Sequence, residues 1–404
     1  MIDLRAARAD PEAFRAALAR KGAAEVFDQL LAADAGWREL VPRVDELRGR
    51  QKLSGKPTPE QVEELKQVKE ELRRLEQELT EAEKARDELL LQVPNPPHES
   101  VPDGDTEEDA AEVRRDGSPP EVADARDHLE LGRFEMDRAA KVSGSRFGYF
   151  LGDSARIALA VYRLALDRLV AAGFTAALPP VLVRDTAMYG TGWFPTEEYN
   201  MYALPADDLY LVGTSEVPMA GLHMEEILDA DALPLRYVAL STCFRREAGA
   251  AGKDRRGMFR VHQFNKVEQF VFCRPEESWD EHERLLANTE EIVKEVGLPY
   301  RVVVLPAGDM SAASAKTYDV ELWFPGQGRY REVASISNTT DYQSRRLQIR
   351  FRGERGVEPV HTLNGTAVTD RFALAVLENY QREDGSVDVP GSLVELGAPS
   401  IARR

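Results

Sequence analysis

Cysteine is scarce in this sequence. Of the 404 residues only Cys243 and Cys273 carry a thiol, and they lie 30 residues apart with no C-x-x-C pair. A disulfide framework and a zinc site built from cysteines are both excluded, because each requires paired or clustered cysteines. The scarcity favours a protein of the reducing cytoplasm, and no zinc is expected.

Long apolar runs are also missing. No 18 consecutive residues are apolar, and the best candidate, residues 157–170, is interrupted by Arg163, Asp167 and Arg168. Since a membrane-spanning helix needs about 20 mostly apolar residues, none is predicted. The first five residues, Met-Ile-Asp-Leu-Arg, lack the basic-then-apolar order of a signal peptide. We therefore expect a soluble protein of the cytoplasm.

Positive charge is in deficit. The chain has 52 Lys and Arg against 70 Asp and Glu, which gives a net charge of −18 at pH 7. A protein this acidic does not attract nucleic acid through a general basic field. Any contact with nucleic acid must therefore be made by a local patch.

Several common catalytic motifs are absent. Residues 249–254, Gly-Ala-Ala-Gly-Lys-Asp, lack the spacer and the Ser or Thr of a phosphate-binding P-loop. There is no G-x-G-x-x-G after a predicted strand, no G-x-S-x-G and no H-E-x-x-H, and the six histidines show no ligand spacing. These absences disfavour a Rossmann dehydrogenase, a serine hydrolase and a zinc hydrolase.

The N-terminal quarter has the pattern of a coiled coil. Apolar residues recur at steps of three and four, at Leu30, Ala33, Trp37, Leu40, Val44 and Leu47, and again at Leu65, Val68, Leu72, Leu75, Leu79 and Ala82. Residues 54–59, Ser-Gly-Lys-Pro-Thr-Pro, interrupt the pattern, and Thr58 and Gln61 are placed to form a capping box for the second helix. A short turn predicts two antiparallel neighbours, that is, a helical hairpin.

The hairpin ends at the proline-rich residues 93–98, which lead into an acidic stretch at residues 103–109. We therefore expect an N-terminal domain over residues 1–105 and a second domain over residues 106–404. Basic side chains gather near the turn, at Arg48, Arg50, Lys52 and Lys56, while the second helix is acidic. The hairpin is thus either a solvated or dimer-forming element or an arm whose basic tip contacts a polyanion.

The rest of the chain predicts an α+β domain. Helices are predicted at residues 153–173, 277–296 and 371–380. Strands are predicted at residues 177–183, 209–212, 237–242, 263–272, 300–304, 319–323, 329–335 and 360–363. Because helices do not separate the strands one by one, a mainly antiparallel sheet flanked by helices is favoured over a doubly wound parallel sheet.

Charged residues interrupt the apolar strand sequences of this domain. They are Arg245, Glu247, Glu268, Glu332 and Arg371. Any one of them fits ordinary strand alternation with the charge facing solvent. Charges on a buried sheet are costly unless they are paired or bind a ligand, so the group as a whole indicates a polar site.

These residues resemble the motifs of the class II aminoacyl-tRNA synthetases, and in particular the bacterial type of seryl-tRNA synthetase. The three class motifs correspond to residues 173–180, residues 244–268 with Phe-Arg-x-Glu at their start, and residues 365–380. Features typical of the seryl enzymes are Gly213-Thr214-Ser215-Glu216, residues 141–147 and Glu332-Val333-Ala334-Ser335. With the hairpin and its proline-rich exit, the resemblance covers essentially the whole chain.

The resemblance implies an ATP site. Arg245 bridges the α-phosphate and the carboxylate of the amino acid, Arg371 binds the γ-phosphate and covers one face of the adenine, and Phe264 stacks on the other face. Glu332 and Ser335 are the expected Mg²⁺ ligands, since this ion prefers carboxylate and hydroxyl oxygens. The remaining residues expected in the ATP pocket are Arg246, Glu247, Val261, Val333 and Ala334.

The resemblance also implies a serine site. Thr214 and Glu216 bind the α-ammonium group, with Ser215 between them, and Arg245 contacts the carboxylate. Glu268 accepts a hydrogen bond from the serine hydroxyl and is assisted by Thr366. A site of this kind rejects alanine by roughly 10⁴-fold or more, because its own polar groups are left unpaired.

The implied activity is a serine–tRNA ligase, which converts ATP to AMP and pyrophosphate and esterifies tRNA(Ser), and tRNA(Sec) where that tRNA exists. A homodimer is expected, and Arg48, Arg50, Lys52 and Lys56 are the expected tRNA contacts. Three other interpretations stay open: activation of an amino acid for a carrier protein, an inactive RNA-binding paralogue, and a specialised second isoform that tolerates an inhibitor. The short hairpin and Ala334 motivate the last of these.

Overall fold

The computed structural model describes residues 1–51, 58–248, 257–354 and 356–404 of the chain. The chain divides into two compact units, Met1–Pro96 and Pro97–Arg404. Each unit has its own hydrophobic core.

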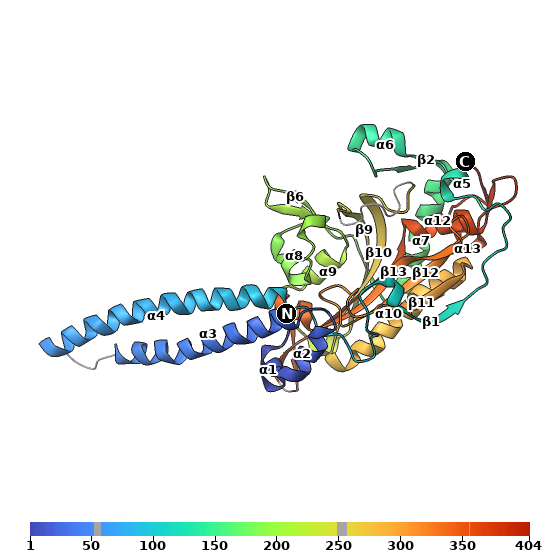
Figure 1. Ribbon diagram of the computed structural model, residues 1–404. Helices are drawn as coiled ribbons and strands as arrows, with labels where there is room; N and C mark the ends of the chain where they lie inside the picture. Colours follow the sequence, from blue (N-terminus) through green and yellow to red (C-terminus); the bar gives the residue numbers. More distant parts are fainter. Residues whose placement is uncertain (52–57, 249–256, 355) are drawn as a thin grey trace. The chain divides into compact units, whose positions relative to one another are not determined.

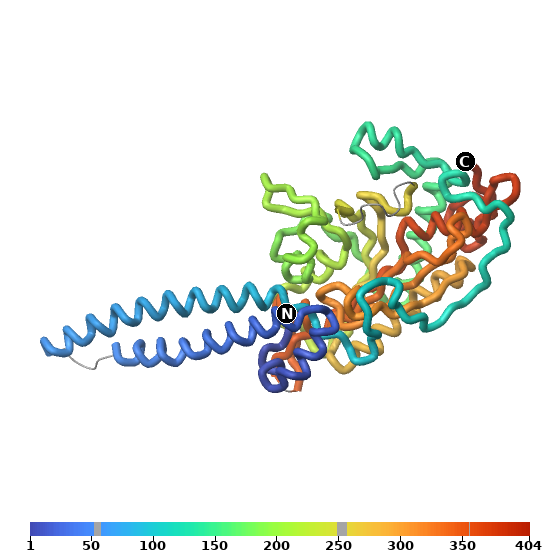
Figure 2. Tube along the Cα trace, in the orientation of Figure 1, coloured from blue at the N-terminus to red at the C-terminus, as the bar shows by residue number. Residues whose placement is uncertain are grey.

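The N-terminal unit is helical, as the heptad pattern predicts. It contains α1 (Leu4–Ala9), α2 (Pro11–Ala19), α3 (Ala24–Arg50) and α4 (Pro59–Gln92). Figures 1 and 2 show α3 and α4 running side by side in opposite directions. Val44 and Leu47 of α3 pack against Val68, Leu72 and Leu75 of α4, so the apolar seam is buried and the predicted hairpin is confirmed.

The start of α4 follows the predicted capping chemistry. The Thr58 hydroxyl accepts from the backbone N–H of Gln61, and the Gln61 side chain accepts from the N–H of Thr58. This pair satisfies two amide groups that a helix N-terminus leaves free. Of the predicted break at residues 54–59, all but Thr58 and Pro59 lie outside the described residues.

The second unit is built on an eight-stranded sheet in the order β1-β11-β12-β13-β16-β10-β9-β4. Its strands are β1 (Ala111–Asp116), β4 (Thr175–Ala177), β9 (Leu235–Phe244), β10 (Gln263–Cys273), β11 (Tyr300–Val304), β12 (Lys316–Phe324), β13 (Arg329–Thr340) and β16 (His361–Thr369). Every pairing is antiparallel except that of β4 with β9. The predicted α+β fold with a mainly antiparallel sheet is confirmed.

Three helices contribute to the core on this sheet: α7 (Gly152–Ala171), α10 (Ser278–Val296) and α12 (Asp370–Asn379). They pack against strands in the middle of the sheet, as Figure 1 shows. On β10 the side chains of Val267, Val271 and Cys273 join this core. Because successive side chains of a strand point to opposite faces, the alternate residues of β10 are left for the other face.

Smaller elements surround the sheet. The short helices are α5 (His128–Leu131), α6 (Met136–Ser143), α8 (Asp185–Thr191), α9 (Glu216–Gly221), α11 (Tyr342–Leu347) and α13 (Gly391–Val394). The short strands are β2 (Phe134–Glu135), β3 (Tyr149–Phe150), β5 (Leu182–Val183), β6 (Tyr202–Leu204), β7 (Leu209–Leu211), β8 (Ile227–Leu228), β14 (Arg350–Gly353), β15 (Gly356–Pro359), β17 (Val387–Asp388) and β18 (Ile401–Ala402). In the described part of the chain, no helix has the length and apolar character needed to cross a membrane.

Two strand predictions differ from the structure. The strand predicted at residues 177–183 is divided between β4 and β5, which belong to different sheets. Pro179 and Pro180 lie between them, and proline cannot donate a ladder hydrogen bond. The edge strand β1 was not predicted, because all six of its residues are exposed and show no apolar alternation.

Candidate active site

A cavity of about 360 Å³ lies on the large sheet, on the face opposite the helices. Strand β10 shows how the sequence produces it. Phe264, Lys266 and Glu268 line the cavity, while Val267 between them belongs to the helix-covered core. The two-residue period of the strand thus separates a polar ligand face from an apolar packing face.

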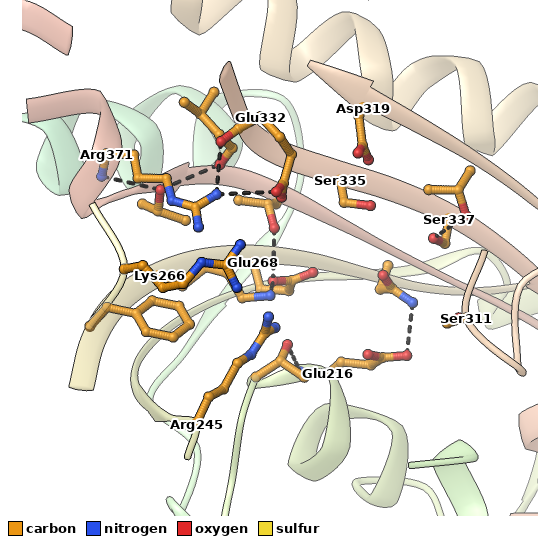
Figure 3. Close-up of a pocket in the computed structure, with 18 of the residues that line it drawn as sticks. Glu216, Arg245, Lys266, Glu268, Ser311, Asp319, Glu332, Ser335, Ser337 and Arg371 are labelled. Atoms are coloured by element: carbon orange, nitrogen blue, oxygen red, sulfur yellow. Dashed lines mark hydrogen bonds and ion pairs between the residues drawn. The ribbon is translucent and has the colours of Figure 1, made fainter. Parts of the chain in front are cut away.

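One end of the cavity contains a pair of opposite charges from different elements. Nη1 of Arg371, at the start of α12, donates to the backbone carbonyl of Glu332 at 2.8 Å and to its carboxylate Oε2 at 3.2 Å. The guanidinium group also lies 4.5 Å from the centre of the Phe259 ring. Figure 3 shows Arg371 and Glu332 pointing toward each other at the top of the view.

Arg245, at the end of β9, presents a second cation. Its Nε donates to the carbonyl of Gly213 at 3.1 Å, and its guanidinium lies 5.5 Å from the ring centres of both Trp193 and Phe264. Within the described chain no carboxylate lies at ion-pair distance from it. The two rings and the carbonyl fix the group, so its charge is available to an anion that enters the cavity.

Oxygen ligands lie beside these arginines. Asp319 on β12 pairs in register with Ser335 on β13, and both line the cavity with Glu332. Oδ1 of Asp319 is buried and has no hydrogen-bond partner among the described residues. Burial and then Glu332 raise the pKa of Asp319. Burial also raises the pKa of Glu332, but Arg371 and Arg245 outweigh it and lower the pKa overall.

The other end of the cavity is lined by two carboxylates, of which Glu268 is buried and Glu216 is partly buried. Glu216 Oε1 accepts from Gln343 Nε2 at 2.7 Å and from Asn364 Nδ2 at 2.9 Å. Burial and the charge of Glu268 raise the pKa of Glu216. Glu268 forms an ion pair with Lys266 and accepts from the Thr366 hydroxyl at 3.4 Å.

The structure brings most of the predicted nucleotide and amino-acid ligands into this one cavity. Those that line it are Thr214, Glu216, Arg245, Glu247, Val261, Phe264, Glu268, Glu332, Val333, Ser335, Thr366 and Arg371. In the described residues, no group of three or more His, Cys, Asp or Glu side chains could hold a metal ion. A metal bound here must therefore also use hydroxyl groups or the substrate.

Among the described residues, three predicted side chains do not line the cavity. Ser215 is fully buried just before α9, and its hydroxyl has no hydrogen-bond partner in the described part of the chain. Ala334 is 1% exposed and belongs to the helix-covered core, so only its backbone can face a ligand. Arg246 does not line the described cavity either, and its backbone N–H donates to the carbonyl of Asn200.

The predicted tRNA contacts lie in the other unit. Arg48 and Arg50 near the end of α3 form exposed ion pairs with Glu76 at 3.0 Å and Glu64 at 3.2 Å on α4. Lys52 and Lys56 lie outside the described residues. Surface ion pairs contribute little to stability, so these arginines can exchange their carboxylate partners for phosphate at small cost.

Several lining residues were missed by the sequence analysis. They include Trp193, Lys266, Asp319, Ser337 and Asn364. Lys266 stands two residues from both Phe264 and Glu268, so strand alternation was a signal that could have identified it. Trp193 and Asn364 had no such signal, because the tertiary fold alone brings them to the cavity.

The chain resembles known proteins in both of its units. Residues 1–97 match the Seryl-tRNA synthetase N-terminal domain, and residues 199–380 match the tRNA synthetase class II core domain (G, H, P, S and T). The serine–tRNA ligase of Thermobifida fusca (strain YX) is 48% identical over 97% of this chain and 96% of its own length.

Solved structures resemble the chain over nearly its full length. The seryl-tRNA synthetase of Pyrococcus horikoshii, complexed with ATP, has a TM-score of 0.93 and 40% identity, and covers 100% of this chain and 99% of its own. The cytoplasmic serine–tRNA ligase of Naegleria fowleri, in complex with AMP, has a TM-score of 0.88 and 33% identity over 98% of this chain and 96% of its own. The chain therefore belongs to the seryl-tRNA synthetases, which are class II aminoacyl-tRNA synthetases and ligases.

Proposed function

We propose that this chain activates L-serine with ATP and transfers the seryl group to the 3′ end of tRNA(Ser). The observation that carries the proposal is the distribution of charge in the cavity. Arg371 supplies a cation at one end, Glu216 and the buried Glu268 supply carboxylates at the other, and Arg245 lies beside these carboxylates (Figure 3). This arrangement of charges suits ATP bound next to an amino acid that carries an ammonium group and a hydroxyl.

The first step needs no general base. A carboxylate oxygen of serine attacks the α-phosphorus of ATP, the bond to the bridging oxygen of the β-phosphate breaks, and pyrophosphate leaves with the electron pair. The main obstacles are repulsion between anions and the alignment of the two reactants. Arg245 addresses both, because its fixed planar guanidinium can bind a carboxylate and a phosphate oxygen together.

The nucleotide is held by residues around Arg371. Its guanidinium is assigned to the γ-phosphate and to one adenine face, and Phe264 to the other face. Glu247 and the backbone of residues 332–335 line the rest of the pocket. Glu247 is fixed by an ion pair with Arg260 at 2.7 Å, so its carboxylate has a defined position.

Magnesium fits the oxygen groups beside the nucleotide pocket. Glu332 and Ser335 would hold the ion, since a carboxylate and a hydroxyl are hard ligands that suit Mg²⁺ together with phosphate oxygens and waters. When bound, the ion neutralises phosphate charge. The lowered pKa of Glu332 agrees with this role, because only the ionised carboxylate is a good ligand.

Serine is recognised at the acidic end. Glu216 and Thr214 receive the α-ammonium group, and Glu268 accepts from the hydroxyl with Thr366 beside it. Because Glu268 is only 1% exposed, it finds no water to replace a missing hydroxyl. An alanine bound in this position leaves the buried carboxylate without the hydroxyl donor of the substrate, which is the physical basis of discrimination.

Transfer to tRNA is assigned to both domains. We assign residues 1–105 to a tRNA-binding arm and residues 106–404 to catalysis, with Arg48, Arg50, Lys52 and Lys56 as the phosphate contacts. The enzyme acts in the cytoplasm, and tRNA(Sec) is a second substrate where it exists. We also propose a homodimer, because Leu159 on α7 and Leu178 after β4 are 65% and 84% exposed, as expected for an interface.

The direct test is exchange of labelled pyrophosphate into ATP, measured with the purified full chain and Mg²⁺. Serine should support exchange, and alanine and threonine should not at equal concentration. A second assay measures acylation of tRNA(Ser) against acylation of a carrier-protein thiol. Absence of serine-dependent exchange would contradict the proposed activity, and acylation of the carrier protein alone would replace tRNA as the acceptor.

A further inference from the structure

We propose that Lys266 is a positioning residue that holds the Glu268 carboxylate in place and thereby sets the preference for serine over alanine. The inference rests on the proposed function, because it concerns how the serine hydroxyl is recognised. Lys266 lies on the cavity face of β10, two residues before Glu268. It is 7% exposed, so its ammonium group has little contact with water.

The contact that carries the proposal is the ion pair of Lys266 Nζ with Glu268 Oε2, two side chains that are 8% and 1% exposed. Removing one partner of a buried pair leaves the other charge uncompensated, so each side chain depends on the other for its position. The same Oε2 accepts from the Thr366 hydroxyl at 3.4 Å. Lys266 and Thr366 therefore fix the orientation of the carboxylate from two sides.

A second carboxylate makes the lysine necessary. Glu216 enters the cavity from α9, and the charge of Glu268 raises the pKa of Glu216 while Lys266 lowers it. Two carboxylates that share a site do not both ionise readily. With Lys266 present, the three groups carry a net charge of −1, which the ammonium group of one amino acid balances.

The other charged and titratable groups near Lys266 do not replace it. Arg245 and Cys243 approach from β9, and Asp370 from the start of α12. Burial raises the pKa of Cys243 to about 11, so the thiol is neutral at pH 7. Arg245 donates to the carbonyl of Gly213 and lies between two rings, and no ion pair joins it to Glu268 in the described residues. Lys266 alone forms an ion pair with Glu268 there.

The consequence is a change in selectivity, not only in rate. A charged Glu268 rejects alanine because the buried carboxylate then lacks the hydroxyl donor. Without Lys266 the carboxylate is no longer held from that side and can turn away from the serine hydroxyl. Serine binding weakens because its hydroxyl loses a well-placed acceptor, while alanine, which makes no such contact, loses nothing.

The test compares Lys266→Met, which removes the charge at similar length, with Lys266→Arg, which keeps it. Pyrophosphate exchange is measured with serine and with alanine, with Lys84→Met on the exposed face of α4 as the matched control. For Lys266→Met we expect the ratio of kcat/KM for serine to that for alanine to fall about tenfold or more. Lys266→Arg should keep the selectivity of the unchanged chain, even where its bulk lowers kcat, because a guanidinium group can still form the ion pair with the Glu268 carboxylate.

Each outcome decides the proposal. If Lys266→Met weakens serine and alanine equally, Lys266 binds the shared carboxylate of both substrates and the proposal is wrong. An unchanged ratio also overturns it, as does a Lys266→Arg enzyme that behaves like Lys266→Met. Melting temperature and ATP binding verify that the variants fold. If the unchanged chain shows no serine-dependent exchange, the proposed function fails, independently of Lys266.

Discussion

Arg371 and Glu332 are bound to each other in this structure. Nη1 of the arginine donates to both the backbone carbonyl and the carboxylate of Glu332, at 2.8 and 3.2 Å. These are the two side chains proposed to bind the γ-phosphate and Mg²⁺. When the nucleotide binds, the contact between Arg371 and Glu332 must therefore break, and each of the two side chains must form a contact with the ligand instead.

This relationship predicts how ATP affinity depends on Mg²⁺. In Glu332→Gln the arginine loses its charged partner, so ATP without Mg²⁺ should bind more tightly than it does to the unchanged chain, because less is given up when Arg371 turns to the phosphate. The gain from adding Mg²⁺ should shrink at the same time, since a ligand is lost. Calorimetric titration of ATP with and without Mg²⁺ measures both. Unchanged dependence on Mg²⁺ would exclude Glu332 as a ligand.

Removal of Arg245 should abolish activation. Arg245→Ala takes away the cation assigned to the α-phosphate and to the serine carboxylate, and loss of one such transition-state contact costs about 10²–10³-fold in rate. The fold should remain, since the guanidinium is only partly buried and donates one hydrogen bond to a backbone carbonyl. Pyrophosphate exchange and melting temperature provide the two readouts. Exchange near the unchanged level would show that Arg245 is not required.

The fold was largely predictable where the sequence carries a local pattern. Strand β11 begins and ends at the predicted residues, because Tyr300–Val304 is an apolar run after a helix stop. The seam of α3 and α4 follows from the heptads. Strand β1 could not be predicted, because it is defined by pairing with β11, which lies far away in the sequence.

Motifs in the sequence predicted most of the residues that line the cavity, but they did not show which alternate positions of a strand face it. A family motif contains Ala334 and Ser335 side by side, yet only the second points into the cavity. Which set of alternate side chains faces a ligand depends on where the helices cover the sheet, and this is a property of the tertiary structure. Lys266 lies within the second class motif, at residues 244–268, but the motif alone does not give its side chain a role.

The dimer can be tested through its exposed leucines. Leu178→Asp and Leu159→Asp place a charge on side chains that are 84% and 65% exposed in the single chain. If these surfaces meet a second copy, burial of an unpaired charge should dissociate it. Sedimentation should then change from twice the chain mass of 45.1 kDa to that mass itself. Lys84→Asp on the hairpin should leave the mass unchanged, and a monomer in the unchanged chain would contradict the proposal.

A buried histidine predicts acid sensitivity. Burial lowers the pKa of His282 to about 4, while its Nε2–H donates to the carbonyl of Ile336 at 3.0 Å. The unfolded chain, with a pKa near 6.5, binds the proton more readily, so the free energy of unfolding falls as the pH drops from about 6.5 to 4. The loss is about 3 kcal/mol. His282→Gln keeps a donor toward Ile336 without titrating. The difference in the free energy of unfolding between the unchanged chain and this variant, measured with urea, should therefore narrow at low pH. A constant difference from pH 7 to pH 5 would argue against this assignment.

The hairpin should determine affinity for tRNA and not activation. Deleting residues 38–79 removes the seam around Val44 and Leu72 but leaves the catalytic unit intact, so serine-dependent exchange should persist while the KM for tRNA(Ser) rises sharply.

The finer test of the hairpin measures how tRNA binding depends on salt concentration. Each phosphate contact contributes somewhat less than one unit to the log–log slope of binding against salt concentration. The variant with Ala at Arg48, Arg50, Lys52 and Lys56 should therefore show a flatter slope. Glu64→Ala with Glu76→Ala, which frees both arginines from their ion pairs, should bind tRNA(Ser) more tightly. If the deletion variant charges tRNA(Ser) as well as the full chain does, the hairpin is not a tRNA-binding arm.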